Sequence, residues 1–194
     1  MNTSKKIKQI AGLGILLALT IIFGIIGNYI QVGPVSFNLS LLPISIGAIL
    51  YGPLAGLFIG IVNGIVVLLS PSTGIFLSFN LLGTILIVLV KTGLAGLASG
   101  FLFKLLKKFN FVVAIILSCI IVPIINTSIF GLGCFTVFSG LLFNGVENAF
   151  VYFCLGIVGW NFIFEITASA ILSPTVVTVV KTIGKKYDIG VNLN

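Results

Sequence analysis

A single lysine lies in the middle of an otherwise apolar stretch of the chain, and it is the first candidate for a chemical role. The stretch runs from Phe79 to Leu106 as FNLLGTILIVLVKTGLAGLASGFLFKLL, with Lys91 near its centre. Its length is sufficient to cross a bilayer. Because a cation in the centre of a membrane costs roughly 3 kcal/mol on insertion scales, we expect Lys91 to face a protein interior or a wet cavity and to serve a function there.

A carboxylate and an amide lie one helical turn apart in the last apolar run. Glu165 follows Asn161 at i+4, so both side chains lie on the same face of a helix. Two arrangements with Lys91 are consistent with this pattern. The two charges could neutralise each other as an ion pair. Alternatively, Lys91 could bind an anionic group of a ligand, while Glu165 and nearby amides bind its hydroxyl or amide groups.

Asparagines form a second pattern, because they fall in the predicted outer half of the membrane or in outer connections. Primary amides donate and accept hydrogen bonds, and inside a membrane they are stable only when paired or hydrated. Their clustering predicts a polar, largely uncharged cavity open to the outside. The alternative is that they cap helices, bond between helices or lie among lipid headgroups. These residues are Asn28, Asn38, Asn63, Asn80, Asn126, Asn144, Asn148 and Asn161.

Catalytic chemistry is not indicated by the sequence. The chain has no histidine, no GxxxxGK[ST] phosphate loop and no acidic pair at catalytic spacing, and its serines lack a base. Cys119, Cys134 and Cys154 show no metal spacing, and buried free thiols are favoured over a Cys134–Cys154 disulfide. We therefore predict a binding protein rather than an enzyme, without catalytic residues, a metal site or a cofactor.

The composition is that of an integral membrane protein. Hydrophobic residues make up 59% of the chain and charged residues 7%, whereas an average soluble domain has about 25% charged residues. Apolar runs of roughly 20 residues separated by turns are typical of helices rather than of a membrane barrel. The predicted fold is an all-α, compact bundle of six transmembrane helices in a single domain, residues 1–194. The predicted helices are 7–28, 37–51, 53–69, 79–106, 111–130 and 159–183, with 131–158 as an outer connection.

The lysines predict the orientation of this bundle. With six spans, the clusters at the N-terminus, after residue 103 and after residue 180 all lie on one side. The positive-inside rule makes that side cytoplasmic, so both termini are expected in the cytoplasm of a multi-pass, prokaryotic-type plasma-membrane protein. A seventh span within 131–158 would move the last lysine cluster outside.

Small residues at helical spacing mark close helix packing. A GxxxG series begins at Gly52 and continues through Gly64, and a second group of glycines follows Lys91. In the first apolar run, Ala11, Gly14 and Ala18 form a small-residue face. That face either packs inward or docks another membrane protein.

Three stretches of the chain resemble a known family. They are FNLSLLPISIGAILYGPLAGLFIGIVNG (37–64), FNLLGTILIVLVKTGLAGLASG (79–100) and GIVGWNFIFEITASAILSPTVV (156–177). Together with the small-residue face, they are similar to the S components, the substrate-binding subunits, of energy-coupling factor (ECF) vitamin transporters, most of all to the pantothenate type. Residues 111–154 match least.

The resemblance implies partners and a site. A transmembrane T component would contact Ala11, Gly14 and Ala18, and two ATPase subunits would hydrolyse ATP. The substrate would bind on the outer side between the last three spans. We expect a water-soluble vitamin, and pantothenate is the first candidate. Its carboxylate suits Lys91, and its hydroxyl and amide groups suit the amides of the chain. The alternatives are an S component for riboflavin, folate or cobalamin, or a stand-alone secondary transporter. The candidate substrate-binding residues are Lys91, Glu165, Asn161, Asn126, Asn80, Trp160 and Asn38.

Overall fold

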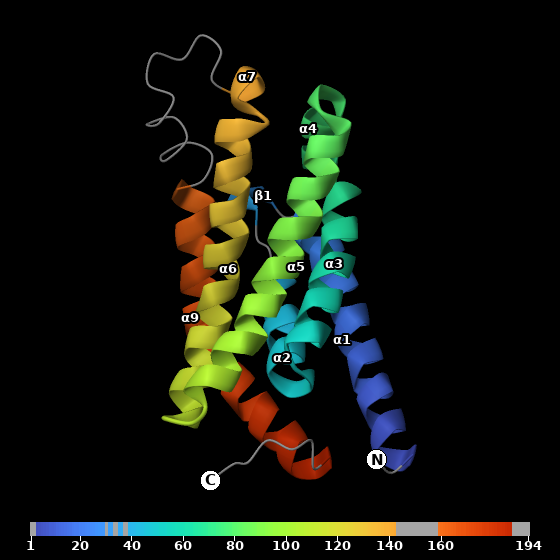
Figure 1. The fold of residues 1–194 in the computed structure, drawn as a ribbon, viewed down its shortest axis with the longest axis vertical. Coiled ribbons are helices and arrows are strands. Elements are labelled where there is room, and N and C mark those ends of the chain that lie inside the picture. Colours follow the sequence, from blue (N-terminus) through green and yellow to red (C-terminus); the bar gives the residue numbers. More distant parts are fainter. Residues whose placement is uncertain (1–2, 30, 33–34, 37–38, 143–158, 188–194) are drawn as a thin grey trace.

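The computed structural model describes residues 3–29, 31–32, 35–36, 39–142 and 159–187 of the chain (Figure 1). Their regular secondary structure is helical apart from two short antiparallel strands, β1 and β2, and one 3₁₀ turn, Pro71–Thr73. The strands are Gln31–Val32 and Val35–Ser36. The helices are α1 (Thr3–Tyr29), α2 (Leu41–Tyr51), α3 (Pro53–Leu68), α4 (Gly74–Phe79), α5 (Leu81–Leu106), α6 (Phe111–Thr136), α7 (Ser139–Leu142) and α9 (Gly159–Tyr187).

Four helices in the described ranges, α1, α5, α6 and α9, are long and apolar enough to cross a membrane. A fifth span is formed if α3 and α4 count as one, although the chain bends by 76° between them. The second predicted span starts later than expected, at Leu41, and α2 has only 11 residues. At 1.5 Å per residue, α2 covers about half of a hydrocarbon core that is about 30 Å thick. The described residues thus form a multi-pass helical membrane protein with four to five candidate spans, while six spans and cytoplasmic termini stay predictions.

Helix α6 is longer than the sequence suggested. We expected it to end at residue 130, before a glycine-broken connection, but it continues to Thr136. Gly131 and Gly133 are both buried, and a methyl group at Gly133 would lie 2.6 Å from Cδ1 of Ile87 on α5. Gly133 therefore allows α5 and α6 to approach each other closely, and neither glycine ends the helix. The rest of the expected connection, apart from 137–142, lies outside the described residues.

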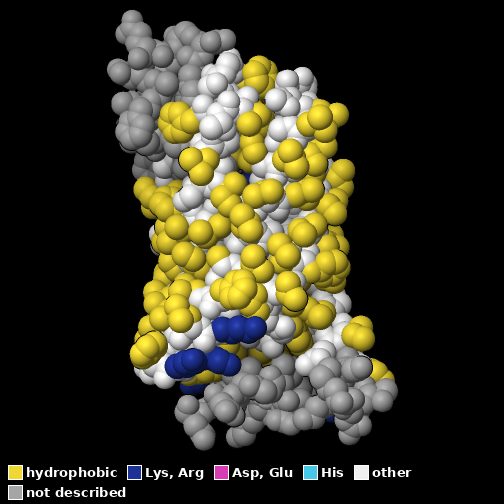
Figure 2. All heavy atoms as spheres, viewed as in Figure 1, with side chains coloured by type: hydrophobic (Ala, Val, Ile, Leu, Met, Phe, Trp, Pro, Cys, Tyr) yellow, Lys and Arg dark blue, Asp and Glu magenta, His cyan; other side chains and the backbone are white. Residues whose placement is uncertain are grey.

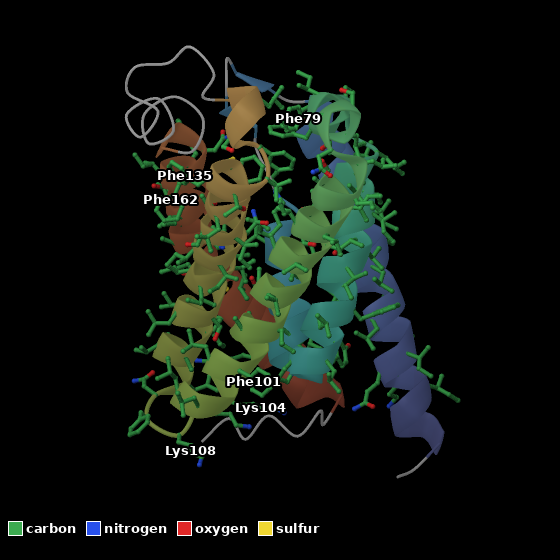
Figure 3. The ribbon with its side chains drawn as sticks, turned by 45° about the horizontal axis from the view of Figure 1, so that its top comes forward. Phe79, Phe101, Lys104, Lys108, Phe135 and Phe162 are labelled. Atoms are coloured by element: carbon green, nitrogen blue, oxygen red, sulfur yellow. The ribbon has the colours of Figure 1, made fainter. Side chains whose placement is uncertain are left out.

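The two ends of the bundle differ in chemistry. One end, called the lysine end below, holds the start of α1 and the ends of α5 and α9; Figure 3 shows Lys104 and Lys108 there. The far end holds α4 and α7, and Phe79, Phe135 and Phe162 lie toward it. Between the two ends, the face seen in Figure 2 is covered largely by hydrophobic side chains. Such a belt suits lipid tails.

Asparagine caps and glycine contacts position the central helices. The Asn80 side chain accepts a hydrogen bond from Gly83 N at 2.8 Å, which starts α5, and Asn110 caps α6 in the same way. Helices α3 and α5 approach each other through small residues, and a methyl group at Gly100 would lie 2.6 Å from Cα of Pro53. The GxxxG series of α3 therefore corresponds to packing inside the bundle.

An apolar cluster in the middle of the bundle is contributed by five helices, α1, α2, α3, α5 and α6. We call it the central cluster. It consists of Leu16, Leu41, Ile44, Ile59, Ala95 and Val122.

Candidate functional site

Lys91 lies on α5 and is half-buried among three helices. Its Nζ atom lies 4.8 Å from the ring centroid of Phe130 on α6, a cation–π contact. The Phe130 ring in turn meets Phe76 of α4 edge to face, with centroids 5.8 Å apart. The ammonium therefore lies beneath a small group of aromatic rings at the far end of the bundle. This is the protein-interior environment that the sequence predicted for Lys91.

Glu165 is half-buried and lies on α9, which packs against α6. Thr127 Oγ1 donates a hydrogen bond to its Oε2 at 3.4 Å, and the Asn126 side chain lies beside the same carboxylate. Lys91 and Glu165 are within electrostatic range of each other. Within the described residues, however, no direct salt bridge joins them. The Lys91–Glu165 site is the name used below for five residues: Lys91, Glu165, Asn126, Thr127 and Phe130.

The contacts of Lys91 in the described structure offset the free-energy cost of a cation in a membrane without using its hydrogen-bond donors. That cost is roughly 3 kcal/mol, and a desolvated cation–π contact contributes about 2 kcal/mol. Attraction to Glu165 contributes as well, but without the hydrogen bonds of a direct pair. The Lys91 ammonium can therefore still donate hydrogen bonds to an anionic group, and the Glu165 carboxylate can accept further ones.

Asn126 is a third polar group of this site. It is 4% exposed, and its Oδ1 atom is buried without a hydrogen-bond partner in the described part of the chain. Asn161 lies on α9 one turn before Glu165, as its spacing required. The structure thus brings four predicted residues, Lys91, Glu165, Asn126 and Asn161, onto three adjacent helices.

The other predicted substrate-binding residues are placed differently. Asn80 is exposed and its side chain oxygen caps α5, which was the structural alternative for these amides. Asn38 and the Trp160 side chain lie outside the described residues. Whether Asn80, Asn38 and Trp160 contact a substrate stays a proposal.

Sequence reasoning missed the two α6 residues that complete the site. Thr127 and Phe130 follow Asn126, and both point to groups on neighbouring helices. A signal was present, because Thr127, Phe130 and Cys134 recur at i+3 and i+7 and so share one helix face. An isolated threonine and phenylalanine in an apolar run are ordinary, however, and only the position of α5 shows that Phe130 meets a cation.

The remaining candidates concern thiols, metals and the first helix. Cys119 and Cys134 are buried free thiols, and Cys154 is not among the described residues. In the searched part of the chain, no group of three metal-ligating side chains occurs. Ala11, Gly14 and Ala18 are all exposed on α1, and nothing lies within 4 Å of a methyl group placed at Gly14. This face therefore points away from the bundle.

Comparison with known proteins identifies the family. The model of the ECF transporter substrate-specific component matches residues 8–177, nearly the whole chain. No curated protein and no solved structure matches the chain. S components are transport subunits that bind a small molecule and work with the membrane-embedded T component and the ATPases of an ECF module. The chain belongs to the family of substrate-specific components of ECF transporters.

Proposed function

We propose that this S component captures a water-soluble vitamin from outside the cell, with pantothenate as the first candidate. The observation that carries the proposal is the Lys91 ammonium, which lies inside the bundle against the Phe130 ring without a direct salt bridge among the described residues. An ammonium in this position suits the carboxylate of a substrate.

The neighbouring groups suit the rest of such a molecule. The Glu165 carboxylate accepts hydrogen bonds from hydroxyl or amide groups, and the Asn126 amide oxygen has no partner in the described structure. Pantothenate carries one carboxylate, two hydroxyls and one amide. Riboflavin, folate and cobalamin are the alternative vitamins, and the proposal ranks them lower because a single ammonium and a few amides suit a small flexible acid better than a large ring system.

Delivery of the substrate requires partners. We propose that Ala11, Gly14 and Ala18 on the exposed face of α1 dock the T component, because small residues allow the backbones of two membrane helices to approach closely. Two ATPase subunits would then drive transport through the T component.

Thermal unfolding of the purified protein in the presence of single vitamins tests the binding function. A ligand that binds only the native state raises the apparent melting temperature by mass action. We expect pantothenate to raise it in a concentration-dependent way, and riboflavin, folate and cobalamin to have smaller effects. A larger shift with another vitamin would replace pantothenate as the substrate, and the absence of a shift with all four would contradict the proposed function.

A further inference from the structure

A layer of polar side chains lies directly above the central cluster, toward the far end. Helices α1, α3 and α6 run toward the far end, whereas α5 runs away from it (Figure 1). On each of these helices, the residue one turn beyond a member of the central cluster is polar. The pairs are Leu16 and Thr20 on α1, Ile59 and Asn63 on α3, Ala95 and Lys91 on α5, and Val122 and Asn126 on α6.

This register puts Asn63 at the same level as two residues of the Lys91–Glu165 site. Residues four positions apart lie one above the other on a helix face. Because Ile59, Ala95 and Val122 belong to one cluster, the residues one turn above them lie in one layer. Helix α2 begins at Leu41, within the central cluster, so the four residues of the layer come from α1, α3, α5 and α6.

Asn63 differs from the other buried polar side chains of α1, α3 and α5. It is 0% exposed, and neither its Nδ2 nor its Oδ1 atom has a hydrogen-bond partner among the described residues. Thr20 and Thr92 are equally buried, but their hydroxyls donate to carbonyls of their own helices, Leu16 O at 2.8 Å and Val88 O at 2.9 Å. The Asn63 side chain lies against Gly24 of α1, with Oδ1 3.4 Å from the position that a Cβ atom would take there.

An amide without partners at this depth calls for an explanation. Burying a donor and an acceptor without hydrogen bonds destabilises a protein, and inside a membrane no bulk solvent compensates. A leucine has the same number and branching of side-chain heavy atoms and would carry no unpaired donor or acceptor. The Asn63 amide is therefore expected to have its partner in another state of the protein.

We infer that Asn63 is a substrate-binding residue on α3. Because its Nδ2 and Oδ1 atoms are both without a partner in the described structure, we assign to it a ligand amide, which offers a separate acceptor and donor, rather than a hydroxyl. The ligand would extend from Lys91, which binds its anionic end, along the polar layer to Asn63. This inference rests on the proposed function and adds to it a contact on α3 and the chemical class of the group bound there.

The test compares Asn63→Leu with Ser118→Ala. Ser118 Oγ is also buried without a partner in the described structure, but it lies on α6 one turn below Val122, on the lysine side of the central cluster. With pantothenate as the probe, we expect Asn63→Leu to weaken binding more than about tenfold. Without pantothenate, the same variant should melt roughly 2–4 °C higher than the wild type, because an unpaired amide is removed. Ser118→Ala should bind pantothenate as the wild type does.

The outcomes separate this inference from the proposed function. Wild-type affinity in Asn63→Leu would overturn the inference alone and would be expected if the amide only bound a buried water. A lower melting temperature of unliganded Asn63→Leu would also overturn it, since Asn63 would then be paired before ligand binding. No response of the wild-type protein to any of the four vitamins would overturn both.

The assigned class of ligand group has its own test. Methylation of the pantothenate amide nitrogen removes its donor. We expect this analogue to bind the wild type more than about tenfold more weakly than pantothenate, and to bind Asn63→Leu no more weakly than pantothenate does. An equal loss in both proteins would overturn the assignment of the amide to Asn63.

Discussion

Replacing Lys91 by methionine removes the charge of the site and keeps an unbranched side chain of similar length. In the wild type, Nζ lies 4.8 Å from the Phe130 ring and within electrostatic range of Glu165. The thioether of methionine can keep a contact with the ring. The substitution therefore changes the electrostatics of the Lys91–Glu165 site more than its packing.

The expected loss of affinity follows from the interaction that only the ligand makes. The cation–π contact and the attraction to Glu165 exist without ligand, so they largely cancel in the binding free energy. What Lys91→Met removes is a charge-assisted hydrogen bond to the carboxylate of the substrate, which contributes about 1.5–3 kcal/mol. This corresponds to a roughly 10- to 150-fold higher Kd. Glu165 then lacks a compensating charge and repels the carboxylate, which moves the expected loss toward the upper limit.

Isothermal titration of pantothenate into the purified protein measures this change directly. Lys104→Met is the matched control, because Lys104 lies on the same helix but is exposed at the lysine end. We expect the control to bind within about twofold of the wild type. A Lys91→Met variant that binds as tightly as the control would refute the role of Lys91 in binding and leave it a structural partner of Glu165.

Three further predictions concern the exposed face of α1, the contact between α3 and α5, and the start of α5. Gly14→Leu on the exposed face of α1 should abolish uptake in cells that hold the ECF module while leaving pantothenate binding by the purified protein unchanged; loss of both would indicate misfolding instead. Gly100→Ala should lower the free energy of unfolding by about 1–3 kcal/mol in chemical denaturation, because the new methyl group meets Pro53, whereas Gly74→Ala has open space and should not destabilise. Asn80→Ala should lower the free energy of unfolding by about 1 kcal/mol, whereas Asn80→Asp should keep the wild-type value, since an amide or a carboxylate oxygen can cap α5.

Much of the site could be predicted because helical periodicity and charge are strong signals in a membrane. Lys91 stands out in an apolar run, and the i+4 spacing of Asn161 and Glu165 puts both on one face whatever the neighbouring helices are. The lysine distribution likewise separates one end of the bundle from the other. These inferences depend only on the repeat of a single helix and on the cost of burying charge.

The remaining features of the fold and the site depend on how neighbouring helices pack, and the sequence of one helix does not determine that packing. The apolar run that contains α2 reads as a span, yet its helix starts at Leu41, after the two short strands. Gly131 and Gly133 resemble helix breakers, but both lie inside α6, where Gly133 packs closely against Ile87 of α5. Asn63 was one of many asparagines, and only its complete burial without a partner in the described structure distinguishes it from Asn80, which caps a helix.

We expect this chain to bind the substrate but not to transport it alone. Uptake of radiolabelled pantothenate into cells that lack their own uptake system, with and without co-expressed T component and ATPase subunits, tests that claim most directly. We expect uptake only when the complete module is present, and its loss when the ATPases are inactivated. Uptake by this chain alone would contradict the account and identify a stand-alone transporter.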